Sequence, residues 1–231
     1  MKSVGSKGGN FTDFPKPEII PAGVHAARCC WVIGLGDQHN AMYEKWQPKV
    51  HITYELPGIP ITFEDKEGVS KTMPRVISPR EYTISMHEKS TLRRDMQAWL
   101  GRQFTDKDVA EFDADPSVLL KSLIGKTCFL QVVHNPNKTD PSKIYANIGA
   151  IMQLPEGSPI GDLANPPIYF DMDDCDDPDE AMEISKIPKW IREKIAASQD
   201  YINYKAAFSV AGAQSNTSVP SVPLKMDQPP F

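Results

Sequence analysis

The chain has 231 residues, 21 prolines and a formal net charge of −5. This length allows one sizeable core with tails or a small appendage, and the proline content disfavours a large α/β enzyme. The acidic balance excludes a protein that is basic throughout. The charge is uneven, because residues 156–183 hold ten Asp and Glu with no Lys or Arg, whereas residues 21–155 hold sixteen basic and fifteen acidic side chains.

Residues 1–18 are predicted to be a flexible N-terminal arm, in which three lysines either contact a phosphate backbone or belong to an unstructured leader. This start has no apolar signal-peptide region, and no stretch reaches the length of a membrane span. We therefore expect a soluble cytoplasmic protein that does not contact a membrane. The cysteines include no CxxC pair, so we expect reduced, buried thiols and neither a zinc site nor a disulfide framework: Cys29, Cys30, Cys128 and Cys175. No cofactor is expected.

Two strands are predicted first. In residues 22–33 one face is expected to hold Ala27, Cys29, Trp31 and Ile33, and the glycines at 34 and 36 allow a bend. The two glycines match the start of the GxGxxG motif of dinucleotide-binding loops, but the third glycine of the motif is missing. We therefore reject a dinucleotide site. Residues 49–56 alternate strictly, which predicts an apolar core face and a polar face with Lys49 and His51 that meets ligand. The charged connection over 57–78 is expected to form a hairpin tip above the binding face.

Residues 81–101 are expected to form a strand followed by a helix. Residues 82–86 alternate as a strand does, Ser90 suits an N-cap, and Gly101 stands at the usual C′ position. The helix carries one apolar stripe at i, i+4 and i+7: Leu92, Met96 and Trp99.

The remaining elements follow in order. A capping box of Thr105 and Asp108 predicts a short helix to Phe112, and another turn or two is expected over 117–124. Two strands are expected at 127–134 and 144–154. The loops at 35–47 and 135–143 would flank a ligand cleft. An acidic segment with a docking helix at 188–197 then occupies residues 156–205, and residues 206–231 have the composition of a disordered linker that ends in a partner-binding tip.

This order of two strands, a strand with a helix, and two more strands predicts a mainly β (α+β) chain. Its domain, residues 19–155, is expected to be a five-stranded OB-fold barrel with a helix between strands 3 and 4, followed by a C-terminal helix and flexible tails. The open face of such barrels commonly holds single-stranded nucleic acid.

The segments AGVHAARCCWVIGLGDQ, YTISMHEKSTLRRDMQAWLGRQFT, GKTCFLQVVH and YANIGAIMQLP resemble phage-encoded single-stranded DNA-binding proteins with an OB-fold core. The end of the chain resembles the C-terminal tip of bacterial single-stranded DNA-binding proteins, although Gln228 replaces a second acid; the matching residues are Asp227, Pro229, Pro230 and Phe231. The resemblance implies binding and protection of single-stranded DNA with little sequence preference in phage replication and recombination. It also implies that the tip recruits phage or host replication and recombination enzymes.

Single-stranded DNA binding requires cations for phosphates and aromatic faces for bases. The candidate DNA-binding residues are Arg28, Trp31, Lys45, Trp46, Lys49, His51, Arg75, Arg80, Arg93, Arg94, Phe129, Lys143 and Tyr145. Trp46 is the strongest aromatic candidate because it lies between two lysines, whereas Tyr54 shares a face with Val50 and Ile52 and is expected in the core. Arg93 and Arg94 also fit a solvated helix face.

The acidic run at 171–180 has three interpretations. A calcium loop fails, because Asp176 stands where Gly is needed and Met182 where Glu is needed. A two-metal nuclease site needs carboxylates on rigid elements, and the run has the composition of a loop, so a metal-dependent nuclease that uses this run is kept only as the less favoured alternative. The third interpretation is an anionic segment that competes with DNA for the cations of the barrel. No nucleophile motif is present, so no enzyme activity is expected. A replisome interaction module without DNA affinity stays open as an alternative, as does a homo-oligomer.

Overall fold

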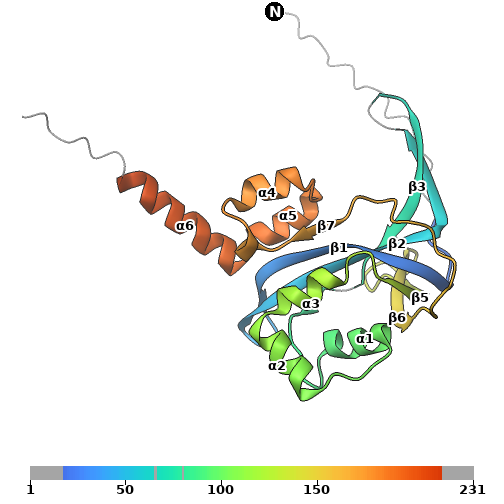
Figure 1. Cartoon of the computed structure of the whole chain (residues 1–231). Helices are drawn as coiled ribbons and strands as arrows, with labels where there is room; N and C mark the ends of the chain where they lie inside the picture. The colour runs from blue at the N-terminus through green and yellow to red at the C-terminus, as the bar shows by residue number, and fades with distance from the viewer. Residues whose placement is uncertain (1–17, 65–66, 80, 215–231) are drawn as a thin grey trace, which may run out of the picture.

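The computed structural model describes residues 18–64, 67–79 and 81–214, and these form a mainly β structure with helices on both sides of one sheet (Figure 1). The seven described strands are β1 (Gly23–Asn40), β2 (Lys45–Glu64), β3 (Ser70–Ile77), β4 (Tyr82–Thr83), β5 (Thr127–Pro136), β6 (Ile144–Gln153) and β7 (Ile168–Phe170). The main path through the sheet is β3-β2-β1-β5-β6, with β4 added to β2 and β7 to β1. All of these pairs are antiparallel except β1–β7.

The first strand is longer than predicted and changes face midway. It continues to Asn40, so the expected loop at 35–47 shrinks to a turn at 41–44. The pairing register with β2 shifts between Cys29 and Trp31, which marks a β-bulge. A bulge reverses which residues face the core. The predicted common face is therefore wrong: Cys29 packs in one core, whereas Trp31 and Ile33 pack on the opposite side of the sheet.

The segment at 57–78 forms a hairpin, as expected, but most of it belongs to the two strands and not to a connection between them. β2 and β3 form a long hairpin that extends beyond the rest of the sheet in Figure 1. Apolar cross-strand pairs such as Ile61 with Met73 favour this pairing. The strand pattern was missed in the sequence because many residues near the turn are charged. By contrast, the predicted strand at 82–86 is short. Its ordered pairing ends at Thr83, and the Ser85 hydroxyl accepts a hydrogen bond from the His87 amide, which turns the chain toward a helix.

Three helices follow β4: α1 (Thr91–Leu100), α2 (Asp106–Ala114) and α3 (Pro116–Ser122). The predicted stripe of α1 is confirmed, since Leu92, Met96 and Trp99 are buried. Gly101 ends the helix with a φ of 66°, and its amide donates to the carbonyl of Gln97.

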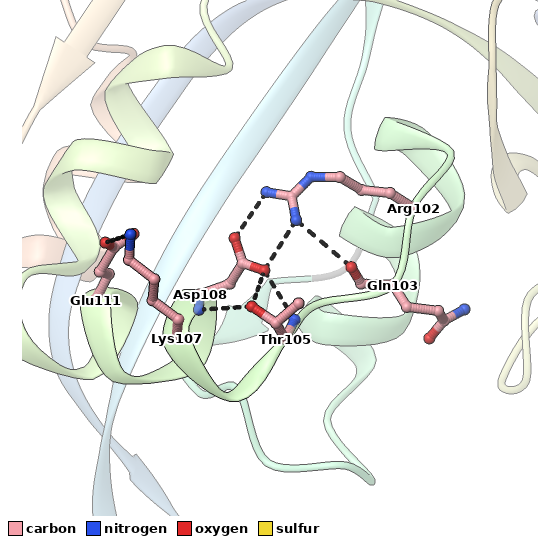
Figure 2. A network of polar contacts seen from close by, with 6 residues as sticks. All are labelled: Arg102, Gln103, Thr105, Lys107, Asp108 and Glu111. Atoms are coloured by element: carbon pink, nitrogen blue, oxygen red, sulfur yellow. Dashed lines mark hydrogen bonds and ion pairs between the residues drawn. The ribbon is translucent and has the colours of Figure 1, made fainter.

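The predicted capping box at the start of α2 is also confirmed (Figure 2). The Asp108 carboxylate accepts hydrogen bonds from the backbone and hydroxyl of Thr105 and from two nitrogens of Arg102, at 2.7–3.0 Å. These bonds, led by that from Arg102, hold the pKa of Asp108 well below its usual range. The network joins the end of α1 to the start of α2.

Two apolar cores lie on opposite faces of the sheet. The first lies against α1–α3, on the core face, and includes Tyr54, Trp99 and Leu130. The second lies on the outer face, where Ile33 and Leu35 of β1 meet the C-terminal segment. That segment contains β7, a 3₁₀ turn (Met172–Asp174), α4 (Pro178–Ile184), α5 (Lys189–Ala196) and α6 (Gln199–Gln214).

The structure confirms one prediction about the C-terminal part and corrects another. The docking helix is confirmed as α5, whose Ile191 and Ile195 are fully buried. The linker expected from residue 206 is wrong as far as Gln214, because α6 continues through an alanine-containing stretch that favours helix. The rest of the linker, the tip and most of the N-terminal arm lie outside the described residues. The cysteines are free, and three of them are buried: Cys29, Cys30 and Cys128.

Candidate nucleic-acid interface

The polar face of β2 was expected to meet ligand, but the C-terminal segment covers it. His51, Thr53 and Glu55 are all buried, with His51 only 3% exposed. The ring of Trp190 from α5 meets the His51 ring edge-on, with 5.1 Å between centroids. Burial, with a smaller contribution from Lys194, lowers the pKa of His51 to about 4. The imidazole is thus held neutral beneath α5, and we leave it out of the interface.

Three other predicted residues lie on the same outer face. Trp31 packs against the second core, and its indole nitrogen donates to the carbonyl of Pro166 at 3.1 Å. Arg28 is half-buried, and its Nε is buried without a hydrogen-bond partner among the described residues. Phe129 of β5 is half-buried between its cross-strand neighbours Ala26 and Met152. The C-terminal segment therefore restricts access to Trp31, while Phe129 keeps a partly open ring.

A cavity of about 760 Å³ lies where the β1–β2 turn faces β4 and the start of α1. We call it the lysine cavity, because three lysines line it from two separate parts of the chain. Lys45 and Lys49 come from β2, and Lys89 precedes α1. Its other lining residues are Asn40, Tyr43, Gln47, Glu81, Tyr82, Thr83, Ser85, His87, Ser90 and Thr91. Alternation along β2 places residues 45, 47 and 49 on this side of the strand.

The lysine cavity carries a net positive charge in an acidic protein. Lys49 donates a hydrogen bond of 2.8 Å to the Thr83 hydroxyl, and the Lys45 ammonium lies 5.9 Å from the centre of the Tyr43 ring. In the described part of the chain, none of the three lysines forms an ion pair. Glu81 is the acidic residue of the lining, and it is already paired with Lys194. Three cationic groups thus face a shared space with their charge uncompensated.

An aromatic ring and a helix terminus complete the cavity. Tyr43 is 65% exposed, and an exposed ring beside lysines is suited to stacking on a base. Ser90 and Thr91 begin α1, and the Ser90 side chain makes no capping hydrogen bond, so the predicted N-cap is present only in its backbone. The amide dipoles at this end favour an anion. Tyr43, His87 and Lys89 were not identified as candidates from the sequence. Only Tyr43 had a detectable signal, because it is an aromatic residue in a polar turn.

The structure scatters the remaining candidates. Trp46 is 41% exposed, but it lies on the opposite side of β2 from Lys45 and meets the His39 ring at 5.2 Å. Arg94 is paired with Asp95 at 2.9 Å, and Lys143 with Asp140 at 3.2 Å.

Three more candidates are absent from the lining of the cavity. The Arg93 guanidinium donates to the Met86 carbonyl at 2.8 Å, and that of Arg75 donates to the Glu18 carbonyl. Tyr145 on β6 is half exposed. Arg80 and the four tip residues lie outside the described residues. Of the twelve candidates within the described residues, the structure brings only Lys45 and Lys49 together in the lysine cavity.

The acidic run folds into short elements with partners of its own. Asp171 accepts from the Asp173 amide and Asp177 from two amides at the start of α4, while Asp174 pairs with Lys121 at 2.6 Å. Burial raises the pKa of Asp171. Within the described ranges, no group of three or more His, Cys, Asp or Glu side chains is arranged to hold a metal ion. The expected competition of this run with DNA stays a prediction, and none of its contacts reaches the lysine cavity.

Comparison of the chain with family models, with curated proteins and with solved structures gives no match. Of the helices in the described residues, none has the length and apolar character that crossing a membrane requires.

Proposed function

We propose that this protein binds single-stranded DNA through the lysine cavity, with little sequence preference. The observation that carries the proposal is the gathering of Lys45, Lys49 and Lys89 around one cavity without an acidic partner in the described structure. Three ammonium groups attract phosphates irrespective of base, and Tyr43 supplies a ring for stacking, which contributes roughly 1–3 kcal/mol per base. Neither interaction distinguishes one base sequence from another.

The strand connections support the finer fold assignment, an OB-fold barrel over residues 19–155. β1 pairs with β2 on one side and β5 on the other, and α1–α3 lie between β4 and β5 in the chain. This connectivity is typical of OB-folds, in which the loop between strands 1 and 2 helps to bind oligonucleotides. The turn at 41–44 occupies that position here, and Tyr43 from this turn lines the lysine cavity.

The biological setting is part of the proposal. The resemblance to phage single-stranded DNA-binding proteins supports a role in phage replication and recombination. The likeness of Asp227, Pro229, Pro230 and Phe231 to a bacterial C-terminal tip supports recruitment of enzymes that act on the same DNA.

The test is a fluorescence-anisotropy titration of labelled oligo-dT and its duplex at low and moderate salt. Replacing Lys45, Lys49 and Lys89 by Ala together is expected to weaken oligo-dT binding by at least tenfold. It is also expected to flatten the salt dependence, by about 0.7 in log–log slope for each phosphate that the variant no longer neutralises.

The matched control removes three exposed lysines that lie outside the cavity: Lys107, Lys126 and Lys189. Equal losses in both variants would mean that net charge alone governs binding. Absence of oligo-dT binding at low salt would reject the proposal and favour an interaction module without DNA affinity.

A further inference from the structure

The hairpin extension, residues 57–64 of β2 and 70–76 of β3, has one face with partly exposed apolar side chains. Cross-strand pairing puts Ile61 beside Met73 and Phe63 beside Lys71 on one face, whereas Thr62 and Thr72 share a hydrogen bond of 2.8 Å on the other. Phe63 is 42% exposed. Ile61 and Met73 beside it are half-buried. Apolar side chains that share one face of a projecting element, with one of them exposed, suit a docking surface.

This apolar face continues the core face of the sheet. Ile77 of β3 is buried in the first core, and alternation carries the same side outward through Arg75, Met73 and Lys71. Any segment that leaves the first core beside β3 is therefore already on the side of the sheet where Phe63 lies.

The N-terminal segment leaves the core at that point. Ile20 is buried in the first core, and its carbonyl accepts a hydrogen bond of 2.8 Å from His134 of β5. Two residues earlier, the carbonyl of Glu18 accepts from the guanidinium of Arg75 on β3. Followed toward lower numbers, the chain thus passes from β5 to β3 and reaches the base of the hairpin extension at Glu18.

We propose that residues 10–17 dock on the apolar face of the hairpin extension, with Phe14 against Phe63. The segment is long enough to reach Phe63. Phe14 is four residues from Glu18, and Lys71, the partner of Phe63, is four residues from Arg75, so each stretch spans about 13 Å when extended. The segment, NFTDFPKP, brings two aromatic rings, Phe11 and Phe14, to this face. Asp13 between them complements the positive charge of Arg75 on that face. Pro15 and Pro17 lack amide donors, so side-chain packing is favoured over addition of a strand to β3.

The test uses the full chain with photoreactive benzoylphenylalanine in place of Phe14. Equal amounts of isotopically heavy and light protein are mixed and irradiated, and the crosslinked peptides are identified by mass spectrometry. Docking within one chain predicts crosslinks to residues 61–73 in heavy–heavy and light–light peptides only. Phe63→Ser is expected to lower their yield several-fold. Glu64→Ser, on the opposite face of the same strand, is expected to leave the yield unchanged.

Each other outcome overturns the proposal in a defined way. Heavy–light peptides would assign the apolar face to a second copy of the chain. Crosslinks outside the hairpin extension would place the segment elsewhere. A weaker oligo-dT affinity of Phe63→Ser, without crosslinks to the hairpin, would assign the face to nucleic acid. Thermal unfolding of both serine variants confirms that they retain the fold before the yields are compared.

Discussion

The carboxylate of Glu55 accepts hydrogen bonds of 2.9 Å from both the backbone and the side-chain nitrogen of Asn165, a residue 110 positions later. The Ala164 amide adds a third donor, and the Asn165 side chain also reaches the carbonyl of Pro74. Glu55 is fully buried in the middle of β2. This one side chain therefore fastens the segment that follows β6 to the outer face of the sheet.

Replacing Glu55 by Gln is expected to lower the free energy of unfolding by about 2–3 kcal/mol. The substitution removes the charge from several buried hydrogen bonds. It also turns an NH₂ group toward the N–H donors of Ala164 and Asn165, which need an acceptor there. Urea denaturation followed by circular dichroism measures the loss. Glu64→Gln, at an exposed position of the same strand, is the control. Unchanged stability of the Glu55 variant would mean that the hydrogen bonds from Ala164 and Asn165 do not contribute to the free energy of unfolding.

The buried His51 makes stability depend on pH. Its folded-state pKa, about 4, is below the usual value of 6.5, so the unfolded chain binds the proton more readily. The contribution of His51 is fully present above about pH 6.5 and is lost as the pH falls toward 4, by roughly 3 kcal/mol in total. The groups that face the ring are Trp190 and Lys194 of α5.

His51→Phe is expected to flatten this part of the pH–stability profile. Denaturation at intervals between pH 7 and 4 measures it, and His87→Phe, at an exposed position, keeps the original slope. If both variants follow the unmodified protein, other groups account for the pH dependence.

The two exposed aromatic residues near the β1–β2 turn are expected to differ in DNA binding. Tyr43 lines the lysine cavity, whereas Trp46 lies on the other side of β2. Tyr43→Ala should therefore weaken oligo-dT binding by roughly 1–3 kcal/mol, about 5- to 150-fold in affinity. Trp46→Ala should change it little. The reverse ranking in anisotropy titrations would move the proposed interface to the Trp46 side.

Gly101 is expected to tolerate a side chain poorly, mainly because of its backbone conformation. Its φ of 66° is left-handed, and a Cβ there would collide with the side chain of Gln153 on β6. Gly101→Ala should lower the free energy of unfolding by at least about 1–2 kcal/mol, from the backbone conformation alone. Gly161→Ala, where the backbone is ordinary and the space is open, is the comparison for the same denaturation assay. A similar small effect at both positions would contradict the expectation.

Local patterns in the sequence were sufficient for much of the framework. The stripe of α1, its glycine stop and the capping box at Thr105 were all predicted, because each depends on residues within a few positions of one another. The alternation of β2 likewise identified its core side, where Tyr54 is buried as expected. Lys45 and Lys49 were identified as cations, although nothing in the sequence joined them to Lys89.

Only the tertiary structure decided what lies on each face. The bulge after Cys29 moved Trp31 and Ile33 to the outer face, and α5 then covered His51 with Trp190. Alternation shows which residues share a face, but not whether another segment buries that face. Here the covering segment begins more than 100 positions later, as the Glu55–Asn165 bonds show. The sequence by itself therefore determined the start and stop signals of α1 and α2 and the apolar sides of α1 and β2. Packing between distant segments determined which polar residues stayed exposed, because burial is a property of the whole chain.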